Sequence, residues 1–316
     1  MSRKLSSVFA TAALMSSTAL ADVPNVAVDI APVHSLVARV MQDVGAPDLI
    51  IRSGASPHDY RLRPSEAKAL QDANLVIWMG KELTPWMEDA VKTLSTEAAI
   101  LTLLEKDETT LLEFRESVLF EEHDHDDHSD EDHAETEDQG HDEHAHGAHD
   151  PHAWLSPENA KIWLNLIAAQ LSTADPDNAS TYFVNAAAAV TEIDTLMADV
   201  STMLDPIRGN SFIVFHDAYQ YFETVFEFPA SGAISLGDAT DPSPARIARV
   251  QDRIQEQKIK CVLAEPQFKK GLVVTVLEGT DAKTSIIDPL GDALEPGPAL
   301  YPQLIRNMAK TLVDCF

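Results

Sequence analysis

The densest group of side chains that could do chemistry lies between Glu121 and Asp150, where histidines alternate with acidic residues. The tract holds fourteen Asp and Glu residues and no Lys or Arg. Imidazole nitrogens bind borderline transition metals, and carboxylates attract cations and can add oxygen ligands. Because such a tract cannot build an apolar core, the sequence predicts a solvated, mobile, metal-binding loop over residues 121–149; a polar linker without a metal role is the alternative. Its eight histidines are His123, His125, His128, His133, His141, His144, His146 and His149.

Isolated polar residues elsewhere in the chain follow predicted strands. His58, His216, Glu265 and Asp288 stand at or just after strand ends, and His152 lies in a loop that could reach the same place. In parallel α/β sheets, ligands bind beyond the carboxyl ends of the strands. Three imidazoles favour tetrahedral Zn²⁺ over Mg²⁺ and Ca²⁺, which prefer oxygen ligands. Each residue alone could equally be a hydrogen-bonding group or part of a turn, so the prediction of a metal site depends on their meeting.

The elements that must position these residues are short apolar strands alternating with helices in both halves of the chain. This alternation predicts an α/β protein of two lobes, each a mostly parallel sheet flanked by helices. Ser65 and Ser156 are the predicted N-caps of two helices, and Pro157 suits a first helical position. Strands are predicted at 25–30, 48–51, 74–79, 98–103, 211–215, 261–264 and 284–287, and helices at 33–44, 66–73, 86–94, 157–171, 177–204, 218–225, 244–257, 272–279 and 301–315.

The segment 177–204 stands out because it contains no Gly or Pro and keeps apolar residues at helical spacing. A helix of this length would be about 40 Å long, enough to join two lobes as one connecting helix. We therefore expect four parts: a signal peptide (1–21), an N-terminal metal-binding lobe that includes the His-rich loop (22–175), the connecting helix (176–204) and a C-terminal metal-binding lobe (205–316).

The start of the chain is typical of an exported protein. Arg3 and Lys4 precede a short apolar stretch that closes with Ala19-Leu20-Ala21, so we expect a signal peptide cleaved after about Ala21 and a periplasmic protein. No stretch is suited to span a membrane. The whole chain carries a net charge of −28, and loss of the two basic residues leaves 51 acids against 21 bases, or −30. Such a charge argues against nucleic acid as a partner and favours cations.

Cysteine appears at two positions, Cys261 and Cys315. An even number in an exported protein predicts one disulfide, which would pin the C-terminal tail to the second lobe. The alternative is a cysteine-containing metal site, but the two cysteines are far apart in sequence and neither has a histidine near it.

Six motifs follow one another along the chain: Gly54-Ala55-Ser56-Pro57-His58-Asp59-Tyr60, Arg63-Pro64-Ser65, Asp150-Pro151-His152-Ala153-Trp154-Leu155-Ser156-Pro157, Phe215-His216-Asp217-Ala218-Tyr219, Glu265-Pro266-Gln267-Phe268 and Asp288-Pro289-Leu290-Gly291. In this order they resemble the metal-specific substrate-binding proteins of bacterial ABC importers, and ZnuA-type zinc-binding proteins in particular. The resemblance covers nearly the whole mature chain. The acidic His tract resembles the loop of the zinc-binding members, and the cysteine pair resembles a disulfide found in some of them.

The resemblance implies that His58, His152 and His216 are ligands of Zn²⁺ and that Asp288 is the carboxylate contributed by the second lobe. His216 stands where manganese-binding relatives tend to have Glu, and a histidine there favours zinc. Pro57 stands where some zinc-binding members have Glu. The fourth ligand would therefore be Asp288, a water molecule or a histidine of the loop.

The predicted function is to capture periplasmic zinc and to deliver it to an inner-membrane ABC permease, without catalysis. Glu265 is expected beside the ligands rather than among them. We expect a monomer, with an accessory periplasmic zinc chaperone as a further partner. Two alternatives stay open: a manganese or iron carrier on the same scaffold, and a zinc hydrolase with Glu265 as base. Nothing like His-Glu-x-x-His occurs in the sequence, which argues against the hydrolase.

Overall fold

The computed structural model describes residues 23–115, 119–120, 149–235, 242–266 and 270–316. The predicted signal peptide with its cleavage point, and the predicted loop histidines other than His149, lie outside the described residues. Across these ranges, none of the helices combines the length and the apolar character that crossing a membrane requires.

The N-terminal lobe is built on a parallel four-stranded sheet with the order β2-β1-β3-β4. Alternate residues of β1 face opposite sides of the sheet: Val26 and Val28 join one apolar cluster with α1, while Ala27 joins another with α2 and α3. Because both faces are covered, the two central strands are apolar throughout. The strands are β1 (Val26–Val28), β2 (Asp48–Leu49), β3 (Leu75–Trp78) and β4 (Ala99–Thr102), each within a predicted range.

The C-terminal lobe repeats this arrangement with the order β6-β5-β7-β8, again all parallel. Its second strand, β6, pairs at the edge as β2 does in the first lobe. β6 was not predicted, because Gly-Ala-Ile-Ser shows neither an apolar run nor clear alternation. The strands are β5 (Phe212–His216), β6 (Gly232–Ser235), β7 (Cys261–Ala264) and β8 (Lys283–Ile286).

Helices cover the faces of the two sheets close to where they were predicted. They are α1 (Ala31–Val40), α2 (Pro64–Asp72), α3 (Pro85–Leu94), α4 (Pro157–Ala174), α5 (Ala179–Leu204), α6 (Gln220–Phe226), α7 (Pro244–Glu256), α8 (Lys270–Leu277) and α9 (Leu300–Cys315), with short 3₁₀ turns at Ala153–Leu155, Pro176–Asn178 and Asp205–Ile207. The fold class predicted from the sequence is confirmed.

One of the two predicted N-caps is confirmed and the other is wrong. The Ser156 side chain accepts a hydrogen bond from the backbone N–H three residues on, at the start of α4. Ser65, in contrast, lies inside α2, and Arg63 holds the cap position. The helix begins earlier because proline at the next position suits a first helical residue and the Glu66 carboxylate accepts a 2.7 Å hydrogen bond from Arg63 N.

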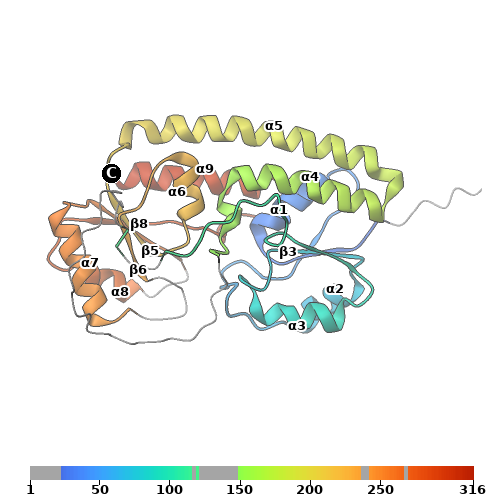
Figure 1. The fold of residues 1–316 in the computed structure, drawn as a ribbon, viewed down its shortest axis with the longest axis horizontal. Helices are drawn as coiled ribbons and strands as arrows, with labels where there is room; N and C mark the ends of the chain where they lie inside the picture. Colours follow the sequence, from blue (N-terminus) through green and yellow to red (C-terminus); the bar gives the residue numbers. More distant parts are fainter. Residues whose placement is uncertain (1–22, 116–118, 121–148, 236–241, 267–269) are drawn as a thin grey trace, which may run out of the picture.

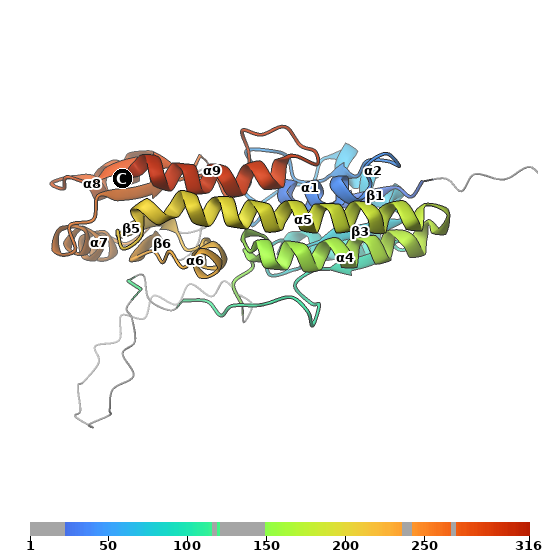
Figure 2. The ribbon, with the colours of Figure 1, turned by 90° about the horizontal axis from the view of Figure 1, so that it is seen from above.

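The long helix α5 lies across both lobes (Figures 1 and 2). It packs against α1 and α4 of the first lobe and against α9. Its 26 residues span about 39 Å. Its buried side chains recur every three or four residues, which is the spacing of one helical face: Tyr182, Ala186, Ala189, Ile193, Leu196, Val200 and Leu204.

The apolar core under α5 is continuous from one lobe to the other. A single cluster of buried side chains includes Val28 and Trp163 of the first lobe together with Val214 and Leu263 of the second. Smaller clusters lie on the far face of each sheet. The two lobes therefore share a core instead of being joined only by loops.

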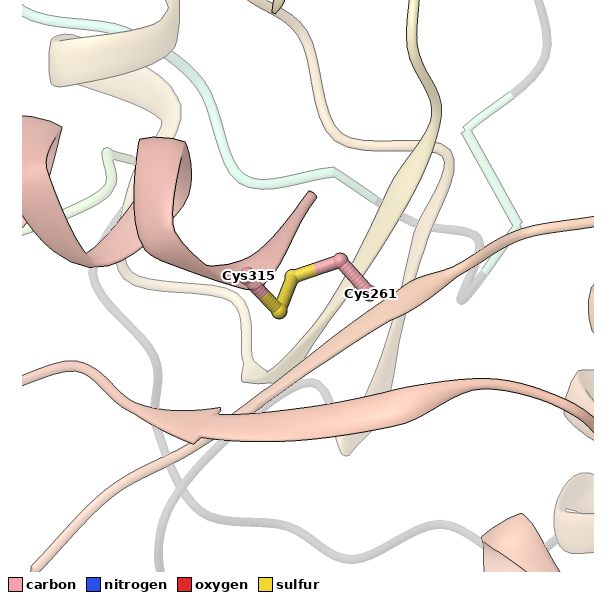
Figure 3. Close-up of a disulfide and its surroundings, with 2 residues drawn as sticks. All are labelled: Cys261 and Cys315. Carbon is pink, nitrogen blue, oxygen red and sulfur yellow. A yellow bond between two sulfur atoms is a disulfide. The ribbon is translucent and has the colours of Figure 1, made fainter.

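The predicted disulfide is confirmed. Cys261, the first residue of β7, is bonded to Cys315, the last residue of α9 (Figure 3). The bond attaches the C-terminal end of α9 to a central strand of the second sheet.

Candidate metal centre

Three histidines from distant parts of the chain meet between the lobes. His58 follows β2, His152 precedes the 3₁₀ turn that leads into α4, and His216 is the last residue of β5. The ring centroids of His58 and His152 are 5.4 Å apart, and those of His152 and His216 are 5.3 Å apart. The convergence expected from the sequence is therefore present in the fold.

The distance between two of these imidazoles suits a tetrahedral ion. Nε2 of His152 lies 3.5 Å from Nε2 of His216. Two nitrogens bound to one tetrahedral Zn²⁺, each about 2.0–2.1 Å from the metal, are separated by about 3.3 Å. Nevertheless, no three His, Cys, Asp or Glu side chains among the described residues form a complete metal-ligand cluster. The two Nε2 atoms still have a spacing that suits two ligands of one tetrahedral ion.

Each histidine of this pair is held by a buried carboxylate on its other nitrogen. Nδ1 of His152 lies 2.6 Å from Asp150 Oδ1, and Nδ1 of His216 lies 2.6 Å from Glu265 Oε1. A carboxylate that accepts the Nδ1 proton leaves the lone pair on Nε2, fixes the ring and raises its basicity as a metal ligand. Glu265 therefore lies behind the His216 ring, on the side opposite Nε2.

Asp150 was missed as a partner of His152, because its motif also suits a simple turn before a helix. The residue is fully buried, and its Oδ1 also accepts a 2.9 Å hydrogen bond from His152 N. Burial raises the pKa of Asp150 to about 7, against the backbone N–H of His152 and the charge of Arg115, which lower it. A carboxylate two residues before a loop histidine was the only signal that the sequence offered.

A cavity of about 10 Å³, roughly the space of one water molecule, lies at the meeting point of the histidines. It is lined by Pro57, His58, His152, Trp154, His216, Pro289 and Leu290. Asp288 is not among these residues. Its Oδ1 accepts hydrogen bonds from Leu290 N at 3.1 Å and Gly291 N at 2.8 Å. Its carboxylate therefore stabilises the turn that forms one wall of the cavity.

Hydrogen bonds between the lobes support the walls of this cavity. Trp154 Nε1 donates to the carbonyl oxygen of Pro289 at 2.8 Å, and Gly54 N donates to Asp292 Oδ1 at 2.7 Å. Gly54 has a φ of +81°, a left-handed conformation that glycine adopts without strain. The loop that carries His58 is therefore attached to the loop that follows β8.

A buried group of charges next to the site was also missed. Arg115 binds two carboxylates of the second lobe, Asp217 and Glu223. Burial raises the pKa of both carboxyl groups, and the hydrogen bonds and charge of Arg115 oppose that rise. No sequence signal connects these residues, because Arg115 is 102 and 108 positions away from its partners.

Known proteins match this chain in sequence over nearly its whole length. A family model described as "ZnuA: Zinc-uptake complex component A periplasmic" matches residues 26–315. A protein from Paracoccus denitrificans (strain Pd 1222), named "High-affinity zinc uptake system protein ZnuA", is 47% identical over 317 residues, which cover 98% of this chain and 96% of the relative. A protein of the same name from Brucella abortus (strain 2308) is 44% identical over 304 residues, covering 92% of this chain and 91% of the relative.

Solved structures share the fold. A structure described as "Crystal structure of ZnuA" has a TM-score of 0.74 at 22% identity, covering 93% of this chain and 99% of that one. Another, described as "Crystal structure of 138-173 ZnuA deletion mutant plus zinc bound", has a TM-score of 0.74 at 21% identity, covering 93% and 98% of the two chains. At such identities the similarity concerns the arrangement of the two lobes and their connecting helix.

Proposed function

The chain belongs to the ZnuA family of periplasmic zinc-uptake components, and we propose that it captures Zn²⁺ between its two lobes and delivers it to the permease of an ABC importer. The observation that carries this proposal is the pair of histidines whose Nε2 atoms lie 3.5 Å apart. Each of them contacts a carboxylate through Nδ1. This arrangement is suited to binding an ion, and the proposed function involves no making or breaking of covalent bonds.

We propose His152 and His216 as the first two ligands and His58 as the third. His58 lines the same cavity, and its ring centroid lies 5.4 Å from that of His152, which supports it as the third ligand. The fourth position is left for Asp288, a water molecule or a histidine of the His-rich loop. For Asp288 to bind, its carboxylate has to release at least one of the backbone N–H groups that it accepts.

Three imidazole ligands support zinc over manganese, because Mn²⁺ prefers oxygen ligands and stands lowest in the affinity order of divalent first-row metals. Glu265, a buried carboxylate, is bonded to Nδ1 of the His216 imidazole. It therefore tunes a nitrogen ligand instead of offering oxygen to the ion. A manganese or iron carrier would be favoured only if manganese displaced zinc at equal concentration.

The proposal also covers the His-rich loop, the processing of the chain, its partners and its division into lobes. The loop 121–149 would bind further zinc ions and raise the local zinc concentration. The protein would be cleaved after about Ala21 and act as a monomer, with a periplasmic zinc chaperone as a further partner. Its parts would be the lobes 22–175 and 205–316 and the connecting helix 176–204.

Titration calorimetry with zinc tests the site and the loop together. Three proteins are compared: the mature chain, a variant lacking residues 121–148, and that variant with His58→Ala, His152→Ala and His216→Ala. Keeping His149 preserves its bridge to Glu113. We expect the deletion to lower the zinc stoichiometry and leave one tight site, and the triple substitution to abolish that site.

His34→Ala in the deletion variant is the matched control. This buried histidine bonds the carbonyl oxygen of Pro47 and lies outside the cavity, so its loss should leave zinc affinity unchanged. An unchanged stoichiometry after deletion would show that the loop binds no zinc. Full zinc affinity in the triple variant would contradict the proposed site.

A further inference from the structure

The segment that precedes the His-rich loop crosses from one lobe to the other. We call residues 109–115 and 119–120 the crossing segment. Its start is held by the first lobe. Trp163 Nε1 donates to Thr109 Oγ1 at 2.9 Å, and the amide group of Asn159 bonds Thr110.

The end of the crossing segment joins the second lobe. Leu119 pairs with Gly232 at the edge strand β6, and Phe120 N donates to the carbonyl oxygen of Ser231 at 3.3 Å.

Arg115 forms the ion pairs of the crossing segment with the second lobe. Its Nε lies 3.0 Å and 2.9 Å from the two carboxylate oxygens of Asp217, and its Nη1 lies 2.8 Å from Glu223 Oε2. The guanidinium carbon lies 3.5 Å from the centre of the Phe120 ring, an additional cation–π contact. Both carboxylates are less than 5% exposed, at 3% and 4%. The guanidinium therefore forms a bidentate contact with Asp217 and also bonds Glu223.

Contacts of the crossing segment lie one residue from His216 and two residues from His152. Asp217 directly follows His216 at the end of β5. On the other side, Leu112 N and the carbonyl oxygen of Asp150 are both bonded to the hydroxyl of Tyr221, and Asp150 holds His152. The crossing segment thus connects the backbone beside one proposed ligand with the backbone beside the other.

Stability alone is a poor reason for this network. A buried ion pair often adds no more stability than apolar side chains of the same size would, because removing the charges from water costs about as much as their attraction returns. A rigid contact between charged groups instead fixes the relative positions of the segments that carry them. The Nε2 pair needs such a geometry, because metal ligands tolerate only small errors in position.

We propose that Arg115 is a positioning residue of the zinc site, which fixes His216 relative to His152 by holding Asp217 and Glu223 against the crossing segment. This inference rests on the proposed function. Loss of Arg115 would free the end of β5 to shift, so the Nε2 pair would no longer be held near the tetrahedral spacing. Zinc would then leave the site faster, and the coordination geometry would become less regular.

The test uses the full mature chain in which the seven histidines from His123 to His146 are replaced by Asn, so that tight binding reports the main site. Three variants are made in this background: Arg115→Met, Arg115→Lys, and Arg115→Met combined with Asp217→Asn and Glu223→Gln. The triple variant leaves no unpaired buried charge, so it should fold even if the single Met variant does not. Arg39→Met with Glu192→Gln is the control, since it removes an ion pair between α1 and α5 whose residues do not line the cavity.

Three quantities are measured: the melting temperature without metal, the rate of zinc release to a chelator, and the visible absorption of the Co²⁺-loaded protein. We expect the triple variant to melt close to the background, to release zinc about tenfold faster, at the low end of the effect of residues that orient metal ligands, and to show a changed Co²⁺ spectrum. Arg115→Lys should be intermediate, because lysine keeps the charge but lacks the fork. The control should match the background.

An unchanged release rate and Co²⁺ spectrum in the triple variant would overturn the positioning role. A faster release that the control variant reproduces would do the same, since it would show a general effect of lost stability. A background protein that holds no zinc, or holds it without His152 and His216, would instead refute the proposed function itself, and the two failures are therefore distinguishable.

Discussion

At the scale of single residues, the site depends on which nitrogen of each histidine carries the proton. Asp150 and Glu265 contact Nδ1 of His152 and His216, so the Nε2 atoms are directed toward each other. Both carboxylates are buried, which makes these hydrogen bonds stronger than they would be in water. The chemistry of the site is thus set as much by the residues behind the histidines as by the histidines themselves.

Another buried carboxylate, Asp29, stabilises the sheet near its carboxyl edge. Its two oxygens accept hydrogen bonds from Ile30 N at 2.8 Å and Met79 N at 2.7 Å, which connects the ends of β1 and β3. Burial raises the pKa of Asp29 to about 7, and the backbone N–H of Met79 and of Ile30 limits the rise. The carboxyl group therefore keeps its proton in the folded protein at pH values where the unfolded chain has lost it.

This difference predicts a pH dependence of stability. Between pH 4 and pH 7 the folded state binds the Asp29 proton and the unfolded state does not, so each pH unit should lower the free energy of unfolding by about 1.4 kcal/mol. Asp29→Asn is neutral at every pH and lacks this dependence. Urea unfolding in the presence of a chelator measures this dependence. The free energy of unfolding of the wild type minus that of the variant should fall by up to about 4 kcal/mol as pH rises through this window. A constant difference would contradict the raised pKa.

At the scale of elements, the site is assembled from the ends of strands and the beginnings of helices. His216 ends β5, Glu265 follows β7, and His152 stands just before α4. The disulfide acts at the opposite end of β7, where Cys261 is bonded to the last residue of α9. Because α9 also packs on α1 and α5, this bond attaches the C-terminal helix firmly to the second sheet.

Removing the disulfide should therefore destabilise the fold strongly. The bond closes a loop with a sequence separation of 54 residues, and the chain-entropy model predicts that Cys261→Ala with Cys315→Ala lowers the free energy of unfolding by about 4 kcal/mol. Denaturant unfolding of both proteins measures the difference. A reducing agent should lower the stability of the wild type and leave the double variant unchanged; equal stability of the oxidised wild type and the variant would refute the expectation.

At the scale of the whole molecule, the two lobes are joined by more than a connector. Helix α5 lies along both (Figure 2), and the buried side chains beneath it form one continuous cluster. Rotating one lobe against the other would open this packed interior, which proteins resist because interiors are close-packed. Zinc binding should then move side chains and loops of the site and leave the lobes nearly in place.

A pair of crystal structures of the variant lacking residues 121–148, with and without zinc, checks this directly. We expect the lobes to differ by only a few degrees of rotation, with the main change in the His58 loop. Solution X-ray scattering of the same variant should give the same radius of gyration in both states. A rotation of tens of degrees, as in binding proteins with flexible hinges, would contradict the shared core.

Much of the fold could be predicted from local patterns. Apolar runs located β1, β3, β5 and β7, and the unbroken helical spacing located α5, because these patterns follow directly from the periodicity of each element. The edge strand β6 was missed, since a strand of small residues becomes recognisable only from its pairing with β5. Ser65 was placed as a cap because the pairing of Glu66 with the Arg63 backbone could not be seen.

For the proposed site, too, some features follow from the local sequence and others only from the tertiary structure. The sequence alone indicated which residues could bind metal: His58 and His216 stand at or after predicted strand ends, His152 lies in a loop, and the chemistry of an imidazole is local. Only the tertiary structure decided which carboxylate stands behind each histidine and that Arg115 joins the two lobes next to them. Those contacts depend on distances between segments as far as 108 residues apart, which no local pattern encodes.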